Sequence, residues 1–346
     1  MAAKTLSKQQ FNALVDRLIG GGRVIGVRRQ ENKFAFGNLA SSDELVLDYD
    51  VTLRSPKVFF QPPKEKLLEF KTDGKTKLEE SREKPQPFVL LGVHTYDLKA
   101  LNQMDSIWAK DNEDEHYLAR RAAATVIALE PTKASKWSFW AWMDGTTIDG
   151  GYDLLLTDIG EGYVIEIGTK EGEKLLKKHA PEARDASSDD LAARDRVRKA
   201  LPTLCNGDRE VKVPAREIPN FIRNSVEHPI WEKQAEKCYS CGSCNLVCPT
   251  CYCFDVKDSL ELDLKSGERN RQWDGCLLES FAVVGSGENF REKRADRFRH
   301  RIFRKAVYMY DKLGELACVG CGRCSEACLP DITDPVKIIN TIKEGN

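Results

Sequence analysis

Hydrophobic residues in the front part of the chain follow both the helix period and the strand period. The amphipathic stretch Gln9–Leu18 predicts a first helix, which the glycines at 20–22 should end. Short apolar runs predict strands at Val24–Val27, Leu45–Leu47 and Val58–Phe60. The pattern therefore predicts a mixture of helices and strands.

A second series of elements follows along the chain. The apolar run Pro87–Val93 predicts a buried strand, and a helix follows from about Tyr96 to Trp108. Three further features are a hairpin-like pair at Leu154–Asp158 and Tyr163–Gly168, a helix at Lys170–His179, and a charged solvated helix or linker at 181–198. These elements precede a change in composition near residues 202–225.

The cysteines divide the chain into two chemically different parts. Only Cys205 lies before residue 238, so the front two thirds carry almost no thiols. We expect an α+β protein in which a mixed α/β N-terminal domain, residues 1–205, serves as a scaffold or docking module. A ferredoxin-type, α-helical domain at 206–346 should follow, with a long insert at 249–317 between its two cysteine motifs.

Eight of the twelve cysteines form two copies of one spacing. The runs are Cys238-x2-Cys241-x2-Cys244-x3-Cys248 and Cys318-x2-Cys321-x2-Cys324-x3-Cys328. A cubane cluster needs four converging thiolates, and in two-cluster ferredoxins the fourth cysteine of each run serves the other cluster. We therefore predict two [4Fe–4S] clusters, the first held by Cys238, Cys241, Cys244 and Cys328 and the second by Cys318, Cys321, Cys324 and Cys248.

Zinc is the main alternative for these motifs, because Cys-x2-Cys pairs also build tetrahedral structural sites. Such a site uses two pairs, whereas triplets in one register, found twice, favour clusters. Disulfides are disfavoured because the Cys-x2-Cys loops are short and no cleavable signal sequence is visible. Four cysteines remain: Cys205, Cys251, Cys253 and Cys276. They either hold a third cluster or are buried structural thiols.

Composition and charge narrow the choice of partners. The chain has 346 residues, 41% of them hydrophobic, and a formal net charge of −1, so no overall field attracts nucleic acid or a membrane surface. No apolar run approaches the roughly 20 residues of a membrane span, and thiolate clusters suit the reducing cytoplasm of an anaerobe. We therefore expect a cytoplasmic protein without membrane insertion.

A basic, aromatic helix is predicted at Phe290–Tyr310 and is a candidate surface for a partner. Nucleic-acid binding through Arg299, His300 and Arg301 is a weaker alternative. Acidic residues stand among the arginines, at Glu288, Glu292 and Asp296, which favours a salt-bridged helix or a protein interface.

The N-terminal part of the chain contains little sequence evidence for a nucleotide-binding or substrate-binding site. The glycines at 20–22 follow a helix and precede a strand, the reverse of a dinucleotide fingerprint, and no Walker sequence occurs. We predict no intrinsic NAD. The alternative function is a catalytic oxidoreductase with its own substrate or flavin site, for which His94, Tyr96 and Asp97 are the candidates. Helix capping by Asp97, together with a polar loop histidine at His94, is the favoured explanation of this motif.

Most of the chain resembles a known family, most specifically at Cys238–Val256, Trp273–Cys276 and Cys318–Cys328. This family comprises the beta subunit of cytoplasmic sulfhydrogenases, the corresponding subunit of anaerobic sulfite reductase, and the iron–sulfur subunit of flavin oxidoreductases that feed heterodisulfide reductase. The resemblance implies an electron-transfer protein that works between a catalytic redox subunit and a flavin/NAD(P)-binding subunit. The catalytic subunit would be of hydrogenase, sulfite-reductase or heterodisulfide-reductase type.

The chain departs from this family in its front part. Relatives commonly carry a cysteine at the position of Tyr96 and further cysteines near Glu130–Trp142, where this chain has Ser138 and Trp140. The resemblance implies that any additional cluster held by those cysteines is missing here.

Overall fold

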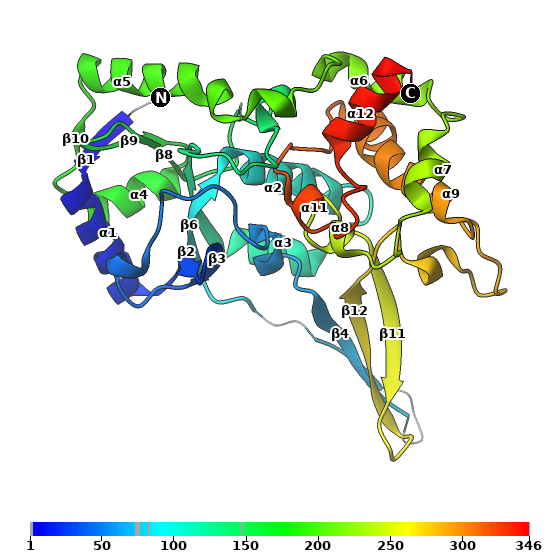
Figure 1. The fold of residues 1–346 in the computed structure, drawn as a ribbon. Helices are drawn as coiled ribbons and strands as arrows, with labels where there is room; N and C mark the ends of the chain where they lie inside the picture. The colour runs from blue at the N-terminus through cyan, green and yellow to red at the C-terminus, as the bar shows by residue number, and fades with distance from the viewer. Residues whose placement is uncertain (1–2, 73–76, 82–83, 147, 346) are drawn as a thin grey trace.

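The computed structural model describes residues 3–72, 77–81, 84–146 and 148–345. An α/β lobe built mainly from the front part lies beside a helical lobe built mainly from the last third, and a narrow β-arm projects from their junction (Figure 1). No helix in the described part of the chain is both long and apolar enough to cross a membrane.

An eight-stranded sheet forms the centre of the α/β lobe. Its strands are β1 (Ala3–Ser7), β2 (Arg23–Gln30), β3 (Lys33–Asn38), β6 (Phe88–His94), β7 (Ala124–Leu129), β8 (Leu154–Asp158), β9 (Gly162–Ile167) and β10 (Arg184–Asp185). They lie in the order β10-β1-β9-β8-β7-β6-β2-β3. The central strands β2, β6, β7 and β8 are parallel, and the outer pairs are antiparallel. Strand β6 reads as a nearly continuous apolar run because both faces of the sheet are covered.

Helices cover the two faces of this sheet. Helices α1 (Lys8–Gly21) and α4 (Lys170–His179) pack on one face, with Phe11 and Leu176 in the same core as Leu91 of the sheet. Helix α2 (Thr95–Trp108) and helix α3 (Glu115–Ala122) pack on the other face, through residues such as Leu101 and Tyr117. Helix α5 (Ser188–Ala200) follows and has no buried residue, as its dense charge predicts.

The helical lobe consists of short helices around one core. They are α6 (Ile218–Arg223), α7 (Ile230–Ala235), α8 (Ser243–Leu246), α9 (Arg294–Phe303), the π-helical turn η8 (Arg304–Tyr308), α10 (Met309–Leu313), α11 (Arg323–Glu326) and α12 (Pro335–Glu344). The core contains Trp231, Phe298 and Ile338, and it also takes in Phe139 from the front part of the chain. The two lobes therefore share buried surface.

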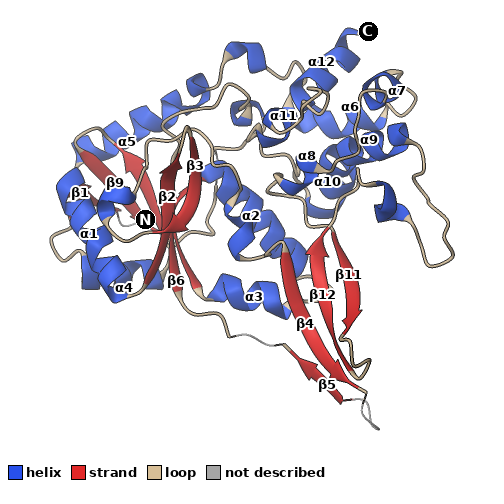
Figure 2. Cartoon of the chain, turned by 60° about the horizontal axis from the view of Figure 1, so that its bottom comes forward, coloured by secondary structure: helices blue, strands red, loops and turns tan. Residues whose placement is uncertain are grey.

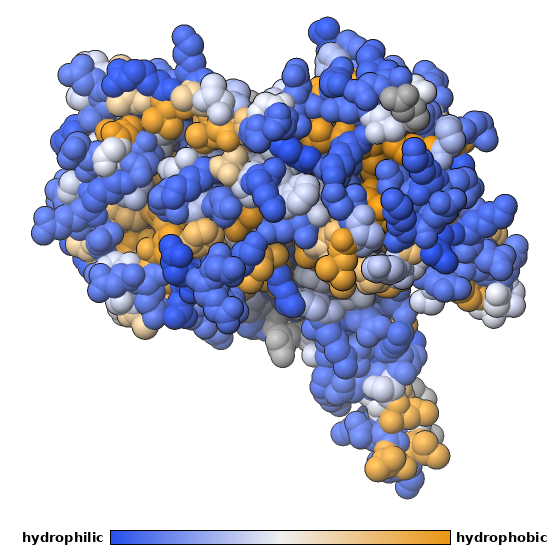
Figure 3. Space-filling model, viewed as in Figure 1, coloured by the Kyte–Doolittle hydropathy of each residue, from blue (hydrophilic) through white to orange (hydrophobic). Residues whose placement is uncertain are grey.

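The arm is a second, antiparallel sheet made from two distant segments. Strands β4 (Lys64–Lys71) and β5 (Lys77–Glu80) come from the front part, and β11 (Phe254–Leu260) and β12 (Ser266–Trp273) come from the insert (Figure 2). Their order is β11-β12-β4-β5. Apolar side chains gather at the tip, where Leu262 is fully exposed and Leu264 largely so (Figure 3). The insert therefore pairs with the front part across the expected domain boundary.

The structure confirms most predicted elements and corrects three. Residues 45–47 lie in an irregular segment packed on the core under α1, and Pro56–Phe59 is a 3-10 turn. Both runs are apolar because their side chains are partly or fully buried, and Pro56 has no N–H for a strand ladder. The predicted helix at Phe290–Tyr310 begins only at Arg294 and changes to a π-turn after Phe303.

A buried ion pair joins the two lobes. Arg323 on α11 donates to both carboxylate oxygens of Asp97 on α2, at 2.6 and 2.7 Å, and the side chains are 2% and 0% exposed. The Arg323 Nε also donates to the Thr52 carbonyl at 2.7 Å. Planar two-point pairing of this kind fixes both the distance and the orientation of its partners. The contact holds the second cysteine loop against the α/β lobe.

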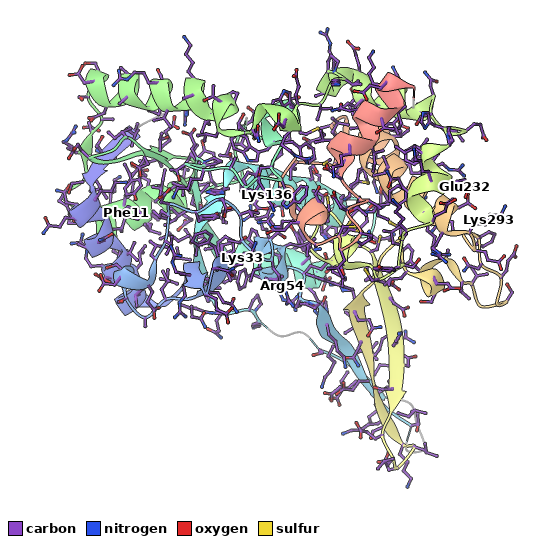
Figure 4. The ribbon with its side chains drawn as sticks, viewed as in Figure 1. Phe11, Lys33, Arg54, Lys136, Glu232 and Lys293 are labelled. Atoms are coloured by element: carbon purple, nitrogen blue, oxygen red, sulfur yellow. The ribbon has the colours of Figure 1, made fainter. Side chains whose placement is uncertain are left out.

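We predict that Asp97→Asn lowers the free energy of unfolding by about 3–5 kcal/mol, because it leaves a buried guanidinium without its counter-charge. Anaerobic denaturant unfolding of the cluster-loaded protein measures this. Glu326→Gln is the control on the same helix, because it removes the more exposed pair with Lys33, labelled in Figure 4, and should cost less than about 1 kcal/mol. Equal losses in both variants would contradict the role of the Arg323–Asp97 pair.

His94 is a buried titratable group in the same region. Its ring stacks on Tyr49 at 3.9 Å, and its Nδ1 lies 2.9 Å from the Tyr96 hydroxyl. Its Nε2 has no hydrogen-bond partner among the described residues. Burial, assisted by the positive charge of Arg323, holds the pKa of His94 well below its usual value. The imidazole is therefore neutral in the folded protein.

We predict that the wild-type protein loses stability as the pH falls from 7.5 to 5.5. The unfolded chain takes up a proton at His94 near pH about 6.5, while the folded chain does not, so the loss approaches about 1.4 kcal/mol per pH unit below that value. His94→Asn keeps a polar atom near the Nδ1 position but cannot titrate. Denaturant unfolding should show a smaller loss for this variant over the same interval. An identical pH slope would refute the assignment to His94.

Candidate functional site

The two cysteine runs fold into loops with the same backbone. Ser240 and Gly320, at equivalent positions, have φ of 51° and 69°, and Gly242 and Gly322 have φ of 71° and 79°. A short helix, α8 or α11, follows the second of these positions in each loop. Left-handed backbone turns at the same two places bring three cysteines of each run onto one side of the loop. The sequence repeat is thus also a structural repeat.

Gly320 is required by the packing as well as by its backbone angle. A Cβ atom at this position would lie 2.5 Å from the backbone N and Cα of Trp140. The neighbouring Phe139 N–H donates to the Gly320 carbonyl at 2.8 Å, and the Ser138 hydroxyl lies 3.4 Å from the Cys321 carbonyl. The front part of the chain therefore rests directly on the second cysteine loop.

A first cavity gathers one set of four cysteines at the protein surface. Cys238, Cys241, Cys244 and Cys328 line it. Cys238 and Cys244 are buried, while Cys241 is exposed. The sulfurs receive local hydrogen bonds, with the Ser240 N–H 3.4 Å from the Cys238 Sγ and the Ile332 N–H 3.5 Å from the Cys328 Sγ. Hydrogen bonds from Ser243 hold the pKa of Cys241 below its usual range.

A second cavity, deeper in the protein, gathers the other set. Cys248, Cys318, Cys321 and Cys324 line it, and none of the four is exposed. In both cavities the fourth cysteine of one run therefore lies with the first three of the other run. This is the crossed arrangement that the spacing predicts, and the ligand assignment itself stays a prediction.

The residues present suit thiolate-bound clusters. Burial raises the pKa of Cys244 and of Cys318 to about 12, so bound iron has to displace their protons. Among the described residues, no group of three or more His, Cys, Asp or Glu side chains forms a site for a single metal ion. A cubane carries its ligands on four separate iron atoms and therefore spreads them more widely than one ion does. The thiol-only donor sets match an iron–sulfur cluster.

Three cationic side chains lie buried near the cysteines. The sequence pattern predicts them on a partner surface instead. Arg297, Arg301 and Lys305 were expected on a partner surface, but they are buried. Arg301 donates to the Cys244 carbonyl at 3.2 Å, and Lys305 donates to the Thr250 hydroxyl at 2.7 Å. Their spacing of four residues is the signal that places them on one helix face. This face points toward the cysteine loops, while Arg299 pairs with Asp296 nearer the surface.

The candidates for a separate catalytic site do not form one around a cavity. His94, Tyr96 and Asp97 are completely buried, and none lines the cavities described here. Asp97 does not cap α2, because the N-cap is His94 and no side chain caps this end. Asp97 instead pairs with Arg323, so the predicted capping role is wrong.

Of the four remaining cysteines, three lie together at one cavity and the fourth lies elsewhere in the structure. Cys251, Cys253 and Cys276 line a third cavity, together with cationic side chains. Cys205 lies elsewhere, packed with Tyr96, Trp140 and Cys321. Tyr96 stacks on Trp140 with ring centroids 6.3 Å apart. Burial raises the pKa of Cys205 to about 11, as expected of an inert structural thiol.

We predict that Cys321→Ser removes one cluster, a loss of about four iron atoms per chain, because it deletes a ligand of the second set. Cys205→Ser is the matched control, since this thiol packs beside Cys321 but belongs to neither set. Iron and acid-labile sulfide analysis of anaerobically purified protein gives the result. Full iron content in the Cys321→Ser protein would disprove the ligand assignment.

Comparison with known proteins agrees with this chemistry. Residues 237–332 match the family model described as a 4Fe-4S dicluster domain, a span that contains all eight motif cysteines. Over 344 residues the chain is 29% identical to the sulfhydrogenase 2 subunit beta of Pyrococcus furiosus, covering 98% of each chain. The predicted resemblance to the beta subunit of sulfhydrogenases is thereby confirmed. The chain is a homologue of the beta subunit of a sulfhydrogenase, and it carries a 4Fe-4S dicluster domain in its C-terminal part.

Proposed function

We propose that this protein is a cytoplasmic electron-transfer subunit that relays electrons through two [4Fe–4S] clusters. Its partners are a catalytic redox subunit, of hydrogenase, sulfite-reductase or heterodisulfide-reductase type, and a flavin/NAD(P)-binding subunit. The proposal rests on one observation above all, the two adjacent four-cysteine cavities, of which the first has an exposed cysteine and the second has none. When bound, the clusters supply one-electron chemistry.

The chain brings the two sets of thiols close together. Cys244 of the first set and Cys324 of the second lie near enough to influence each other electrostatically. Arg301 donates to the backbone at Cys244 and also lines the second cavity. A fixed positive charge in this position stabilises added negative charge at either cluster. This supports electron transfer between the two cavities through the protein interior.

The first cavity has the surroundings of an entry or exit point for electrons. Cys241 is exposed, and Tyr239 and Leu329 beside the cavity are 70% and 90% exposed. Exposed apolar side chains around a redox centre favour close contact with another protein, which excludes water. The sulfhydrogenase relative is by name one subunit of a larger enzyme, which favours a hetero-oligomer.

The alternative of an independent catalytic oxidoreductase has less support. The front-domain side chains considered for it are engaged in buried contacts, since His94 lies at hydrogen-bond distance from the Tyr96 hydroxyl and Asp97 pairs with Arg323. The chain contributes ligands and positive charge around the cysteines, and these are the requirements of an electron relay.

We predict that the tagged chain co-purifies anaerobically with a flavoprotein, and that NAD(P)H then bleaches the visible cluster absorption of the complex. Leu329→Glu should slow this bleaching about tenfold or more, because a charge at the apolar contact is desolvated on docking. Leu329→Met is the matched control that keeps the surface apolar. Both variants should retain full iron content.

Two results would contradict this proposal. An unchanged bleaching rate in the Leu329→Glu complex would show that electrons from the flavoprotein do not enter at the first cavity. Rapid reduction of the isolated chain by NAD(P)H would favour the catalytic alternative with its own nucleotide and flavin chemistry.

A further inference from the structure

The third cysteine cavity lies at the root of the β-arm. The β11–β12 hairpin brings its thiols together, because Phe254 pairs with Trp273 and the Asp274 N–H donates to the Cys253 carbonyl at 3.1 Å. The chain thus leaves the first motif through Cys251 and Cys253 and returns beside them at Cys276. Residues far apart in the insert are placed together by hairpin register.

A buried amide links two of these thiols. The Asn245 Nδ2 lies 3.3 Å from the Cys276 Sγ and 3.7 Å from the Cys251 Sγ, and Asn245 is buried. Gly275 permits this approach, since a Cβ there would lie 2.7 Å from the Asn245 Cβ. Amide N–H groups directed at sulfur are typical of thiolate ligands, whose charge they stabilise.

The third cavity is surrounded by positive charge. Arg301, Arg304 and Lys305 line it, and the Lys57 Nζ donates to the Cys251 carbonyl at 2.7 Å. Within the described part of the chain, these four side chains form no ion pair with a carboxylate: Arg304 donates to the Tyr252 hydroxyl, and the Arg301 Nε has no hydrogen-bond partner. Arg301 and Lys57 are only 3% and 2% exposed.

Neutral thiols do not explain this environment. Burying cations without counter-charge is costly, so the site calls for an anionic group. Arg301 and Lys305 also line the second cavity, but Arg304 lines the third cavity and not the second. A thiolate-bound cluster at the third cavity would place negative charge next to Lys57, which is buried over the Trp273 ring, and next to Arg304, which is half-buried over the Tyr252 ring.

We propose that Cys251, Cys253 and Cys276 hold a third iron–sulfur cluster, of the [4Fe–4S] type with three protein thiolates. A cluster is favoured over one ion because no single-ion site forms among the described residues and because the donors are all sulfur. Three thiolates leave the fourth iron with a ligand that is not one of these cysteines, such as water.

The third cluster extends the electron path toward the arm. The Cys251 thiol hydrogen-bonds the Cys248 thiol, which belongs to the second set, so the second and third cavities are neighbours. Cys251 and Cys253 are half-buried, as are Cys248 and Cys318 of the second set, whereas Cys321 and Cys324 are buried. The electron-transfer role of the third cluster rests on the proposed relay, whereas the assignment of its cysteine ligands does not. The third cluster gives the second cluster a neighbour at the root of the arm, on a path other than the one through the first cavity.

Metal analysis of the full chain, purified anaerobically, tests the proposal. We expect about twelve iron atoms per chain in the wild type and about eight in Cys253→Ala and Cys276→Ala, with Cys205→Ala remaining at the wild-type value. One-electron oxidation by ferricyanide should convert the three-cysteine cluster to the [3Fe–4S]⁺ form, with release of its fourth iron as Fe²⁺. The corresponding EPR signal should be absent from Cys253→Ala.

The outcomes separate this inference from the relay itself. About eight iron atoms in the wild type, unchanged in Cys253→Ala, would overturn the third cluster and leave the two-cluster relay intact. Zinc that is lost in Cys253→Ala would overturn it as well. About four iron atoms or fewer would contradict the relay. If the cysteine variants do not fold, Arg304→Gln keeps the ligands, and an unaltered potential of every cluster in that variant would count against the site.

Discussion

The exchange of the fourth cysteine between the two runs constrains the rest of this structure. Cys248 lies with the second set and Cys328 with the first, so two loops separated by a long insert have to be neighbours. The insert must leave and return at the same place. The antiparallel β11–β12 hairpin and the helix that follows it satisfy this condition. The β11–β12 hairpin of the arm thus helps to return the chain to the first cysteine loop, as the crossed arrangement requires.

Charge is the second condition that the fold meets. Thiolate-bound iron–sulfur clusters gather negative charge in a protein interior, and the helix α9 with its π-turn provides the opposite charge. Arg301 on α9 and Lys305 in the π-turn both face the cysteine loops. A π-turn changes the phase of a helix, and such turns are frequent at functional sites. The cations are held by packing, so the interior is positive before any cluster binds.

The α/β lobe supports the second cysteine loop. Trp140 packs against Gly320, and Asp97 pairs with Arg323 inside the loop itself. Phe139 belongs to the core of the helical lobe, while Met309 and Ala317 belong to a core of the α/β lobe. The domain boundary between residues 205 and 206 therefore stays a prediction. In the structure, the two parts of the chain share buried cores. This contact fits a scaffold whose task is to hold the loops rigid.

The sequence by itself determined the elements and the chemistry that depend on local spacing. The helices around α1, α2 and α4, the β8–β9 hairpin and the two cysteine runs were all predicted from periodicity or motif. Tertiary structure decided what depends on distant partners. The sequence could not show that β4 pairs with β12, that Arg323 pairs with Asp97, or that Cys276 joins Cys251 while Cys205 lies apart. Local preferences fix a residue's own backbone, but contacts between distant segments depend on the packing of the whole chain.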